Sequence, residues 1–331
     1  MPDMQKLLPI VLLLVLSVAL IPAASASLID ESDEDYFDLV PAKPVVLDTA
    51  QKQVSYGLNG FAQWLDSFFD NQRAIDEEAT TRLRIKQSTV LTEGESIRLK
   101  LNVNLNIHLP NLKNEVNIFI SGTDNEQINS GQVDTDSVSA SDRDQNIGVQ
   151  ISPYVTRKKH VSLLAGIKLD SLEVFVGPRY RRTSNFDTWQ TRFTQQLRWF
   201  SKKGWQATTR FDQERFISDR AFFRNTLEGR WRQEKSGYRI NLNPRVVFRL
   251  GSSKALEYQL SNEFITHPVH RLSQSVFSVR YRQRFKRDWL FMELQPQLIF
   301  SHDNEYDPTP GFVLRFEVML GGKQIKSGLI H

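Results

Sequence analysis

Cysteine is absent from the 331 residues of this chain, and long apolar runs are almost absent. The lack of cysteine excludes disulfides, thiolate catalysis, cysteine-held metal ions and a lipidated N-terminal cysteine. After residue 26, no stretch is long and apolar enough for a transmembrane helix. Mean hydropathy is −0.39 and 24% of the residues are charged, which excludes a bundle of membrane helices. These values do not exclude a membrane protein made of strands, because such strands bury only alternate residues.

The N-terminal segment has the pattern of a secretory signal. Lys6 precedes the apolar run Leu7–Ile21, and Ala24-Ser25-Ala26 fits the small-x-small cleavage rule. We therefore predict a cleaved signal peptide at residues 1–26 and export of the mature chain. The alternative is a retained anchor at Leu7–Ala26, which could barely span a bilayer.

Charge is distributed unevenly along the chain. Asp30–Asp38 carries six acidic residues and no basic one, so residues 27–53 are expected to form an acidic, extended lead. From Ala79 onward, 38 lysines and arginines stand against 25 aspartates and glutamates. Such a basic bias can indicate nucleic-acid binding. An exported chain rarely meets nucleic acid, and we expect no nucleic-acid partner.

Residues 54–78 have helical periodicity, with an apolar stripe. The stripe consists of Leu58, Phe61, Leu65 and Phe68, widened by Trp64 and Phe69. Three roles remain open for this amphipathic helix: a plug entering a barrel, a helix lying on the membrane surface, or a cap on the periplasmic rim. A helix of this kind could also recruit a periplasmic partner.

The clearest strand pattern lies between Trp189 and Trp199. Its polar and apolar-leaning residues alternate with a period of two, and Ser201-Lys202-Lys203-Gly204 then supplies a turn. The two tryptophans share one face and are ten residues apart. That separation corresponds to roughly 33 Å along the strand, or about 25 Å at a tilt of around 40°. An apolar band of that height, edged by aromatic residues, is typical of a strand in a transmembrane barrel.

The same alternation repeats through residues 79–320, and we predict an all-β, antiparallel, up-and-down barrel of about fourteen strands (twelve to sixteen fit the pattern). The expected strands are Thr81–Leu91, Ile97–Leu109, Val116–Ser121, Ile147–Thr156, Val161–Leu169, Leu172–Arg181, Trp189–Trp199, Trp205–Phe211, Phe223–Arg232, Tyr238–Leu250, Leu256–Thr266, Leu272–Phe285, Trp289–Phe300 and Phe312–Leu320. A short tail, residues 321–331, follows. A soluble sandwich is disfavoured because the strands are long and their polar faces are rich in arginine.

Two details of the strands make further predictions. The longest polar linkers, residues 122–146 and 302–310, follow the third and thirteenth strands, which places both on the extracellular side. Prolines also interrupt four expected strands, and each is expected to mark a bulge or a boundary. These prolines are Pro153, Pro178, Pro244 and Pro296.

Arginines dominate the polar faces of these strands and are the candidate functional residues. An arginine facing mid-bilayer lipid would cost about 2–4 kcal/mol, so these side chains should point into the lumen. Fixed cations in a water-filled lumen would favour anions. The candidate anion-selective, lumen-lining residues are Arg98, Arg192, Arg198, Arg224, Arg230, Arg239, Arg245, Arg249, Arg280, Arg282 and Arg284. Arg82, Arg84, Arg179, Arg181, Arg210, Arg232 and Arg315 share those faces.

Carboxylates on the same faces provide the alternative interpretation. They are Glu173, Asp212, Glu228, Glu257, Glu263, Glu293 and Glu317. Arginine–carboxylate pairs could fill a narrow, closed barrel that conducts nothing. The arginines outnumber the acids, however, which favours a cationic channel.

No enzymatic site is predicted. His267 and His270 lie three residues apart beside Ser273 and Ser275, but no amide partner completes a catalytic arrangement, and two histidines lack a third metal ligand. Glycine loops for phosphates or dinucleotides are also missing. We therefore expect no catalytic residues, no metal site and no cofactor.

The signal peptide, the absence of cysteine and the amphipathic strands together resemble a bacterial outer-membrane β-barrel over residues 79–320. The resemblance implies an outer-membrane location and contact with the lipid bilayer and lipopolysaccharide. It also implies insertion by the barrel-assembly machinery. Its aromatic girdle would comprise Trp189, Trp199, Trp205, Trp231 and Trp289. Residues 321–331 depart from a chain ending at the last strand. A porin-like channel for small anionic or polar solutes is the resulting hypothesis, with a structural or assembly barrel or, less favoured, a barrel hydrolase as alternatives.

Overall fold

A computed structural model describes most of the region predicted to form strands. It describes residues 81–109, 115–121, 146–156, 158–169, 171–186, 188–285, 287 and 289–321, with Phe61, Trp64, Leu65 and Phe68. The predicted signal peptide, the acidic lead, the linker 122–145 and the tail beyond residue 321 lie outside the described residues. Within the described part, no helix has the length and apolar character needed to cross a bilayer.

Fourteen strands form the described fold, as the alternation predicted. They are β1 (Arg82–Thr92), β2 (Arg98–Leu109), β3 (Glu115–Ser121), β4 (Asn146–Val155), β5 (Lys159–Lys168), β6 (Glu173–Phe186), β7 (Trp189–Phe200), β8 (Gly204–Phe216), β9 (Ala221–Arg232), β10 (Lys235–Gly251), β11 (Lys254–Ile265), β12 (Arg271–Arg284), β13 (Leu290–Ser301) and β14 (Pro308–Gly321).

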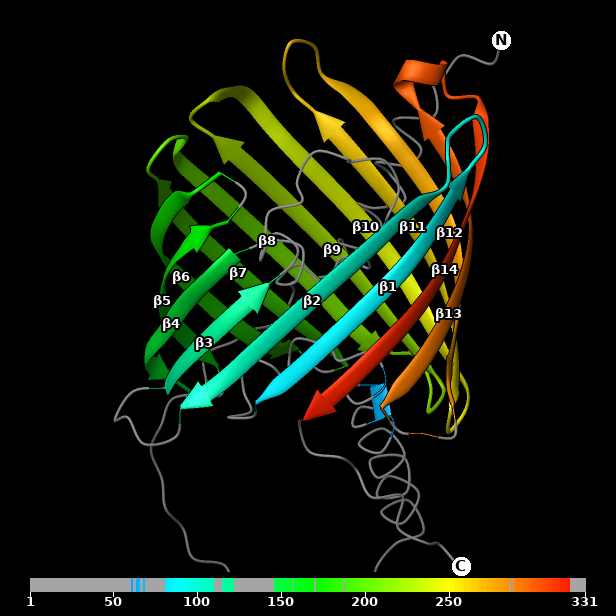
Figure 1. Ribbon diagram of the computed structural model, residues 1–331, viewed down its shortest axis with the longest axis horizontal. Coiled ribbons are helices and arrows are strands. Elements are labelled where there is room, and N and C mark those ends of the chain that lie inside the picture. Colours follow the sequence, from blue (N-terminus) through cyan, green and yellow to red (C-terminus); the bar gives the residue numbers. More distant parts are fainter. Residues whose placement is uncertain are drawn as a thin grey trace, which may run out of the picture. The chain divides into compact units, whose positions relative to one another are not determined.

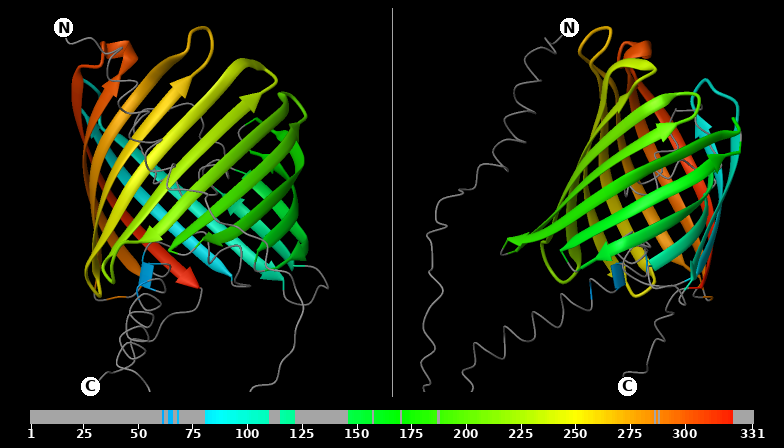
Figure 2. Two further views of the ribbon diagram at one scale, coloured as in Figure 1. Left: turned by 180° about the vertical axis from the view of Figure 1, so that it is seen from behind. Right: turned by 90° about the vertical axis from the view of Figure 1, so that its left-hand side faces the viewer.

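Every strand pairs antiparallel with its neighbours in sequence, and β1 pairs with β14 to close the barrel. The closing register runs from Arg82 opposite Gly321 to Thr92 opposite Gly311. Figure 1 shows the tilted strands, and Figure 2 shows the same closed wall from two further directions. Closure leaves no unpaired sheet edge, which is the condition for strands to span a bilayer.

Several strands are longer than their sequence pattern predicted. β14 begins at Pro308, which lies opposite Phe300 of β13, so part of the predicted 302–310 linker is strand. The remaining linker contains a short 3-10 helix, η2 (His302–Asn304). β10 begins at Lys235, three residues before the strand predicted from Tyr238, because residues 235–237 form an irregularity in the pairing with β9 and do not form the hairpin turn. Gly237 has φ +81° there, a conformation that favours glycine.

The prediction for the strand prolines was right once and wrong three times. Pro153 lies where the register between β4 and β5 shifts, as a bulge requires. Pro178, Pro244 and Pro296 lie in unbroken registers with one neighbour, opposite Leu163, Asn225 and Phe312. With the other neighbouring strand, these three prolines form no pair. The register between those two strands is nevertheless the same on both sides of each proline. A long barrel strand therefore accommodates a missing N–H on one side without a bulge.

Phe61, Trp64, Leu65 and Phe68 are helical and buried, and they pack on the inner wall of the barrel. Their partners lie at the end where β9, β11 and β13 begin, and include Phe222, Val247, Ala255 and Phe291. Trp64 Nε1 donates a hydrogen bond to the carbonyl oxygen of Ser252, 3.0 Å away. This contact agrees with a plug or rim cap, two of the three roles left open by the sequence.

Candidate functional site: the inner wall of the barrel

The two faces of the strands differ in chemistry. Outward positions carry exposed apolar side chains, such as Leu99 and Leu101 on β2 and Phe316 on β14. Inward positions carry buried polar and charged side chains. Among the described residues, ten buried lysines and arginines stand against seven buried aspartates and glutamates. The basic set is Lys168, Arg179, Arg181, Arg192, Arg198, Arg210, Arg224, Arg280, Arg282 and Arg315, and the acidic set is Glu173, Asp212, Glu214, Glu228, Glu257, Glu293 and Glu317.

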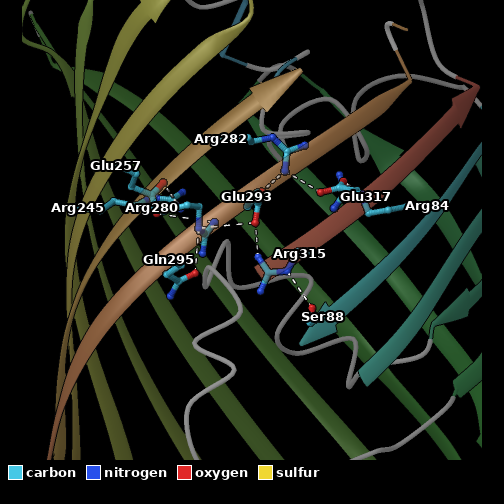
Figure 3. A network of polar contacts seen from close by, with 10 residues as sticks. All are labelled: Arg84, Ser88, Arg245, Glu257, Arg280, Arg282, Glu293, Gln295, Arg315 and Glu317. Carbon is cyan, nitrogen blue, oxygen red and sulfur yellow. Dashed lines mark hydrogen bonds and ion pairs between the residues drawn. The ribbon is translucent and has the colours of Figure 1, made fainter. Parts of the chain in front are cut away.

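Glu293 on β13 is the centre of the largest charged network, shown in Figure 3. Its carboxylate forms ion pairs with Arg282 on β12 and Arg315 on β14, and its Oε2 lies 3.9 Å from Nε of Arg280. One carboxylate thus faces three guanidinium groups from the two neighbouring strands. The side chain of Glu293 is 3% exposed, so these charges interact with little screening by solvent.

Two more glutamates extend this network along the wall. Glu317 on β14 binds Arg84 and Arg282, with N–O distances of 3.0 and 2.7 Å. Glu257 on β11 lies between Arg245 and Arg280, at 3.8 and 3.9 Å. Neutral side chains also take part: Arg315 Nε donates to Ser88 Oγ, and Arg280 Nε to Gln295 Oε1. The network therefore joins five arginines to three glutamates across β10 to β14 and β1, and carries a positive excess.

A second group of ion pairs covers β8 and β9. Arg210 donates from Nε and Nη2 to Oδ1 of Asp212, at 2.9 and 2.7 Å, and Thr226 donates to the same oxygen. Arg224 pairs with Glu214 at 2.8 Å. Arg192 on β7 lies opposite Asp212 in the register. Guanidinium and carboxylate groups thus alternate around much of the inner wall.

Amide side chains fill the inward positions between the charges. Buried nitrogen or oxygen atoms of Gln196, Gln206, Asn243, Gln295 and Gln297 have no hydrogen-bond partner within the described part of the chain. Polar atoms buried without a partner are costly, and inside proteins they are normally bonded to water. The inner wall is therefore suited to contact with water rather than to a dry core.

No family model and no curated protein matches this chain. Among solved structures, it is similar to the outer membrane protein OmpT of Vibrio cholerae (6% identity, TM-score 0.49, 74% of this chain and 98% of that chain). It is also similar to OprB of Pseudomonas putida (8%, 0.49, 77% and 97%) and to the outer membrane channel DcaP of Acinetobacter baumannii (5%, 0.45, 73% and 96%). Similarity at this level carries no argument about function, and the fold follows from the chain's own pairing. The fold is that of an outer-membrane β-barrel.

The eleven candidate arginines all lie at inward positions of the barrel wall but differ in surroundings. Arg224, Arg230, Arg245, Arg280 and Arg282 pair with carboxylates. Arg192 and Arg198 are buried, and Arg198 stacks on Phe175 and Phe200. Of the others, Arg98 pairs with Glu95, Arg239 pairs with Glu263, Arg249 stacks on Trp64, and Arg284 donates to Ser252 O. Their role in anion selection stays a prediction.

The proposed girdle tryptophans lie at both ends of the strands. Trp189 is the first residue of β7, and Trp289 directly precedes β13 at the same end of the barrel, where it is 36% exposed. Trp199 and Trp205 lie opposite each other at the other end, at 39% and 44% exposure, and Trp231 pairs with Ala207 nearby. This spacing fits the two interfaces of a bilayer.

Sequence reasoning missed a serine–histidine pair on the inner wall. Ser152 Oγ on β4 lies 3.0 Å from Nε2 of His160 on β5, across the bulge at Pro153. Arg181 Nη2 lies 3.0 Å from Nδ1 of the same ring. Because a guanidinium can only donate, Nδ1 accepts and the ring proton lies on Nε2, which donates to Ser152. A histidine in this tautomer is no general base for that serine, so the pair does not support acyl transfer.

The histidines considered in the sequence lie elsewhere. His267 and His270 are exposed in the linker between β11 and β12. Glu214, the partner of Arg224, was also missed, because the predicted strand ended at Phe211 while β8 continues to Phe216. No single cluster unites the sequence-predicted residues; the inner wall as a whole is the candidate site.

Proposed function

We propose that this protein is an outer-membrane channel for the passive passage of small anionic or polar solutes. The cationic inner wall carries the proposal. Among the described residues, buried basic groups outnumber buried acidic ones, and several buried amide atoms between them have no hydrogen-bond partner, which favours contact with water. Barrels of about eight strands are filled by side chains, whereas about sixteen to eighteen leave an aqueous channel. A barrel of fourteen strands is closer in size to the barrels with an aqueous channel than to the filled ones, which supports a water-filled lumen.

The arrangement of charge supports selection by sign. Each carboxylate of the main network is shared by two or three arginines, so the wall keeps an excess of guanidinium groups after all pairs are formed. Guanidinium groups hold carboxylates and phosphates in planar, bidentate contacts. A fixed positive excess in a low-dielectric channel raises the local concentration of anions. Small anions are therefore the preferred solutes.

A non-conducting structural barrel is the second candidate function, and the burial of the wall favours it. Arg198, Arg282 and Arg315 are no more than 3% exposed, so side chains cover much of the inner surface. The aromatic residues of the segment 61–68 cover a further part of the wall at one end.

Planar-bilayer electrophysiology separates these two functions. A channel gives discrete current steps when the purified barrel is added to a bilayer. A correctly folded barrel that passes no current, with and without residues 54–78, contradicts the channel and supports the structural function.

A further inference from the structure

The outer face of β4, β5 and β6 changes in chemistry towards the end of the barrel at which β5 begins. Three rows of outward residues follow one another there, and the residues of each row lie opposite one another in the registers of these strands. The first row is apolar and consists of Ile151, Leu163 and Pro178. The other two rows, which we call the tyrosine–cation patch, are Tyr154, Val161 and Tyr180, and then Lys159 and Arg182.

Two local features of the chain position the patch. Ser152 is buried on the inner face, so in a regular strand Tyr154, two residues later, would also point inward. The bulge at Pro153 shifts the register by one residue and places Tyr154 opposite the outward Val161. The turn that follows is held by Thr156, whose Oγ1 accepts a hydrogen bond from the backbone N–H of Lys159 at 2.9 Å. Both ends of the patch on β4 and β5 are therefore set by the backbone.

Lys159 and Arg182 form a pair of like charges on the outer face. They lie directly opposite each other, and both side chains are exposed. Like charges in this arrangement destabilise a sheet. Among the described residues, neither side chain has a hydrogen-bond or ion-pair partner, and no outward position of β4, β5 or β6 carries a carboxylate. The pair is therefore suited to an anion supplied by another molecule.

Tyr154 and Tyr180 lie between this pair and the apolar row. Their hydroxyl groups make no hydrogen bond within the part of the chain that the structure describes. A tyrosine has an apolar ring and a polar tip, and a long basic side chain carries its charge to the edge of the hydrocarbon. From the apolar row to the cations, the surface thus follows the order of a phospholipid: acyl chain, ester group and phosphate.

We propose that the tyrosine–cation patch binds one anionic phospholipid of the leaflet at this end of the barrel. The phosphate oxygens accept hydrogen bonds from Lys159 and Arg182, and the two tyrosine hydroxyls donate to the phosphate or the ester oxygens. The acyl chains lie against the apolar row. A zwitterionic headgroup carries its own cation, so the patch prefers a headgroup with a net negative charge. The proposal depends on the barrel lying in a membrane and not on conduction.

The outer face of β11 and β12 offers a matched control at the same end of the barrel. Lys254 opens β11 and lies opposite Gln283 of β12, so a single cation faces a neutral amide there. The nearby Tyr281 donates its hydroxyl hydrogen to Oε1 of Gln283 at 2.9 Å. This region has a tyrosine and a cation, but it lacks the opposed charges, and its hydroxyl already has an acceptor.

Native mass spectrometry of the purified protein in neutral detergent tests the proposal. Phosphatidylglycerol and phosphatidylcholine with the same acyl chains are titrated separately, and the natural protein should bind one phosphatidylglycerol in preference. Arg182→Gln should weaken that binding about fivefold, the effect of one basic residue near an anionic lipid surface. Lys254→Gln removes the same charge and should leave the binding unchanged. Equal binding of the two lipids by the natural protein, or equal losses in the two variants, overturns the proposal.

A second pair of variants changes no charge. Tyr180→Phe removes one hydroxyl of the patch and should weaken the binding of phosphatidylglycerol about fivefold, whereas Tyr281→Phe should not change it. Unchanged binding in Tyr180→Phe, with Arg182→Gln impaired, contradicts the place given to the tyrosines. Displacement of the lipid by an equal concentration of inorganic phosphate contradicts a lipid site, because the acyl chains then contribute nothing.

Discussion

Arginine, at the scale of single residues, determines the character of the inner wall. Its planar guanidinium offers five donors, so one side chain can bridge two carboxylates, as Arg282 does between Glu293 and Glu317. A lysine would supply a point charge without that geometry. The network therefore depends on a few shared carboxylates that hold several arginines at once.

Glu293 is the carboxylate on which most of the network depends. Glu293→Gln removes the negative charge that Arg280, Arg282 and Arg315 share, and leaves buried guanidinium groups facing one another. We expect a loss of about 3 kcal/mol in the free energy of unfolding, the scale of breaking a buried pair. Urea unfolding in lipid vesicles measures it.

Glu263→Gln is the matched control for Glu293→Gln. Glu263 is 27% exposed and has one partner, Arg239, at 3.6 Å, so the change should cost less than about 1 kcal/mol. Equal losses for the two variants would show that the network around Glu293 contributes nothing beyond an ordinary surface pair.

The sequence was sufficient to predict that these arginines share one face of their strands, but not which side chains they contact. A period of two places Arg192 and Arg198 on one face without any knowledge of neighbours. Pairing depends on the register between strands, which bulges such as that at Pro153 change by single residues. The contact between Ser152 and His160 crosses that bulge, and no spacing in the sequence signals it.

Strands, at the scale of elements, were easier to predict in number than in length. Alternation identified all fourteen because each wall strand separates lipid from lumen over its full length. It failed at the ends, as in β14, where Pro308 and Pro310 suggested a linker although they pair with Phe300 and Leu298. Proline at an end of a strand loses little, since the hydrogen bond that it cannot donate lies at the margin of the sheet.

Gly177 on β6 is required by the close approach of β7. A Cβ atom there would lie 1.9 Å from the carbonyl oxygen of Leu197 and 2.7 Å from Cα of Arg198. Gly177→Ala must therefore separate the two strands, and we expect a loss of about 3 kcal/mol or failure to fold. Heat-induced unfolding monitored on a gel provides the measurement.

Gly251→Ala serves as the control for Gly177→Ala, because nothing lies within 4 Å of a Cβ atom at Gly251. Its stability should stay within about 0.5 kcal/mol of the natural protein. A stable Gly177→Ala barrel would mean that β6 and β7 do not approach each other as described.

The segment around Trp64 is held by contacts that a single substitution can weaken. Trp64 stacks on Phe68, donates to Ser252 O and lies under the guanidinium of Arg249. Trp64→Ala removes all three contacts, and a buried tryptophan lost in this way costs about 3–5 kcal/mol. We expect protease to cleave within residues 54–78 much faster in the variant, while the barrel stays intact.

Trp205→Ala, on the outer face, is the control for Trp64→Ala and should leave cleavage of that segment unchanged. If Trp64→Ala also leaves it unchanged, the four aromatic and aliphatic residues do not hold the segment on the wall.

The whole molecule separates two environments by the alternation of its strands. Apolar side chains form the exterior, and a wall of guanidinium, carboxylate and amide groups forms the interior. The sequence was sufficient to predict this division and the positive excess. Both depend only on which residues are present and on which face of a strand each residue lies. The sequence could not predict how far pairing neutralises the excess, which is the quantity that would decide the selectivity of the proposed channel.

The reversal potential in a gradient of potassium chloride across a planar bilayer tests the central claim most directly. The cationic wall should give a potential with the sign of chloride selectivity. Arg280→Gln, which removes a charge from the main network, should shift the potential toward zero, whereas Arg220→Gln in the exposed linker after β8 should not. A potential with the sign of potassium selectivity in the natural protein would contradict the account.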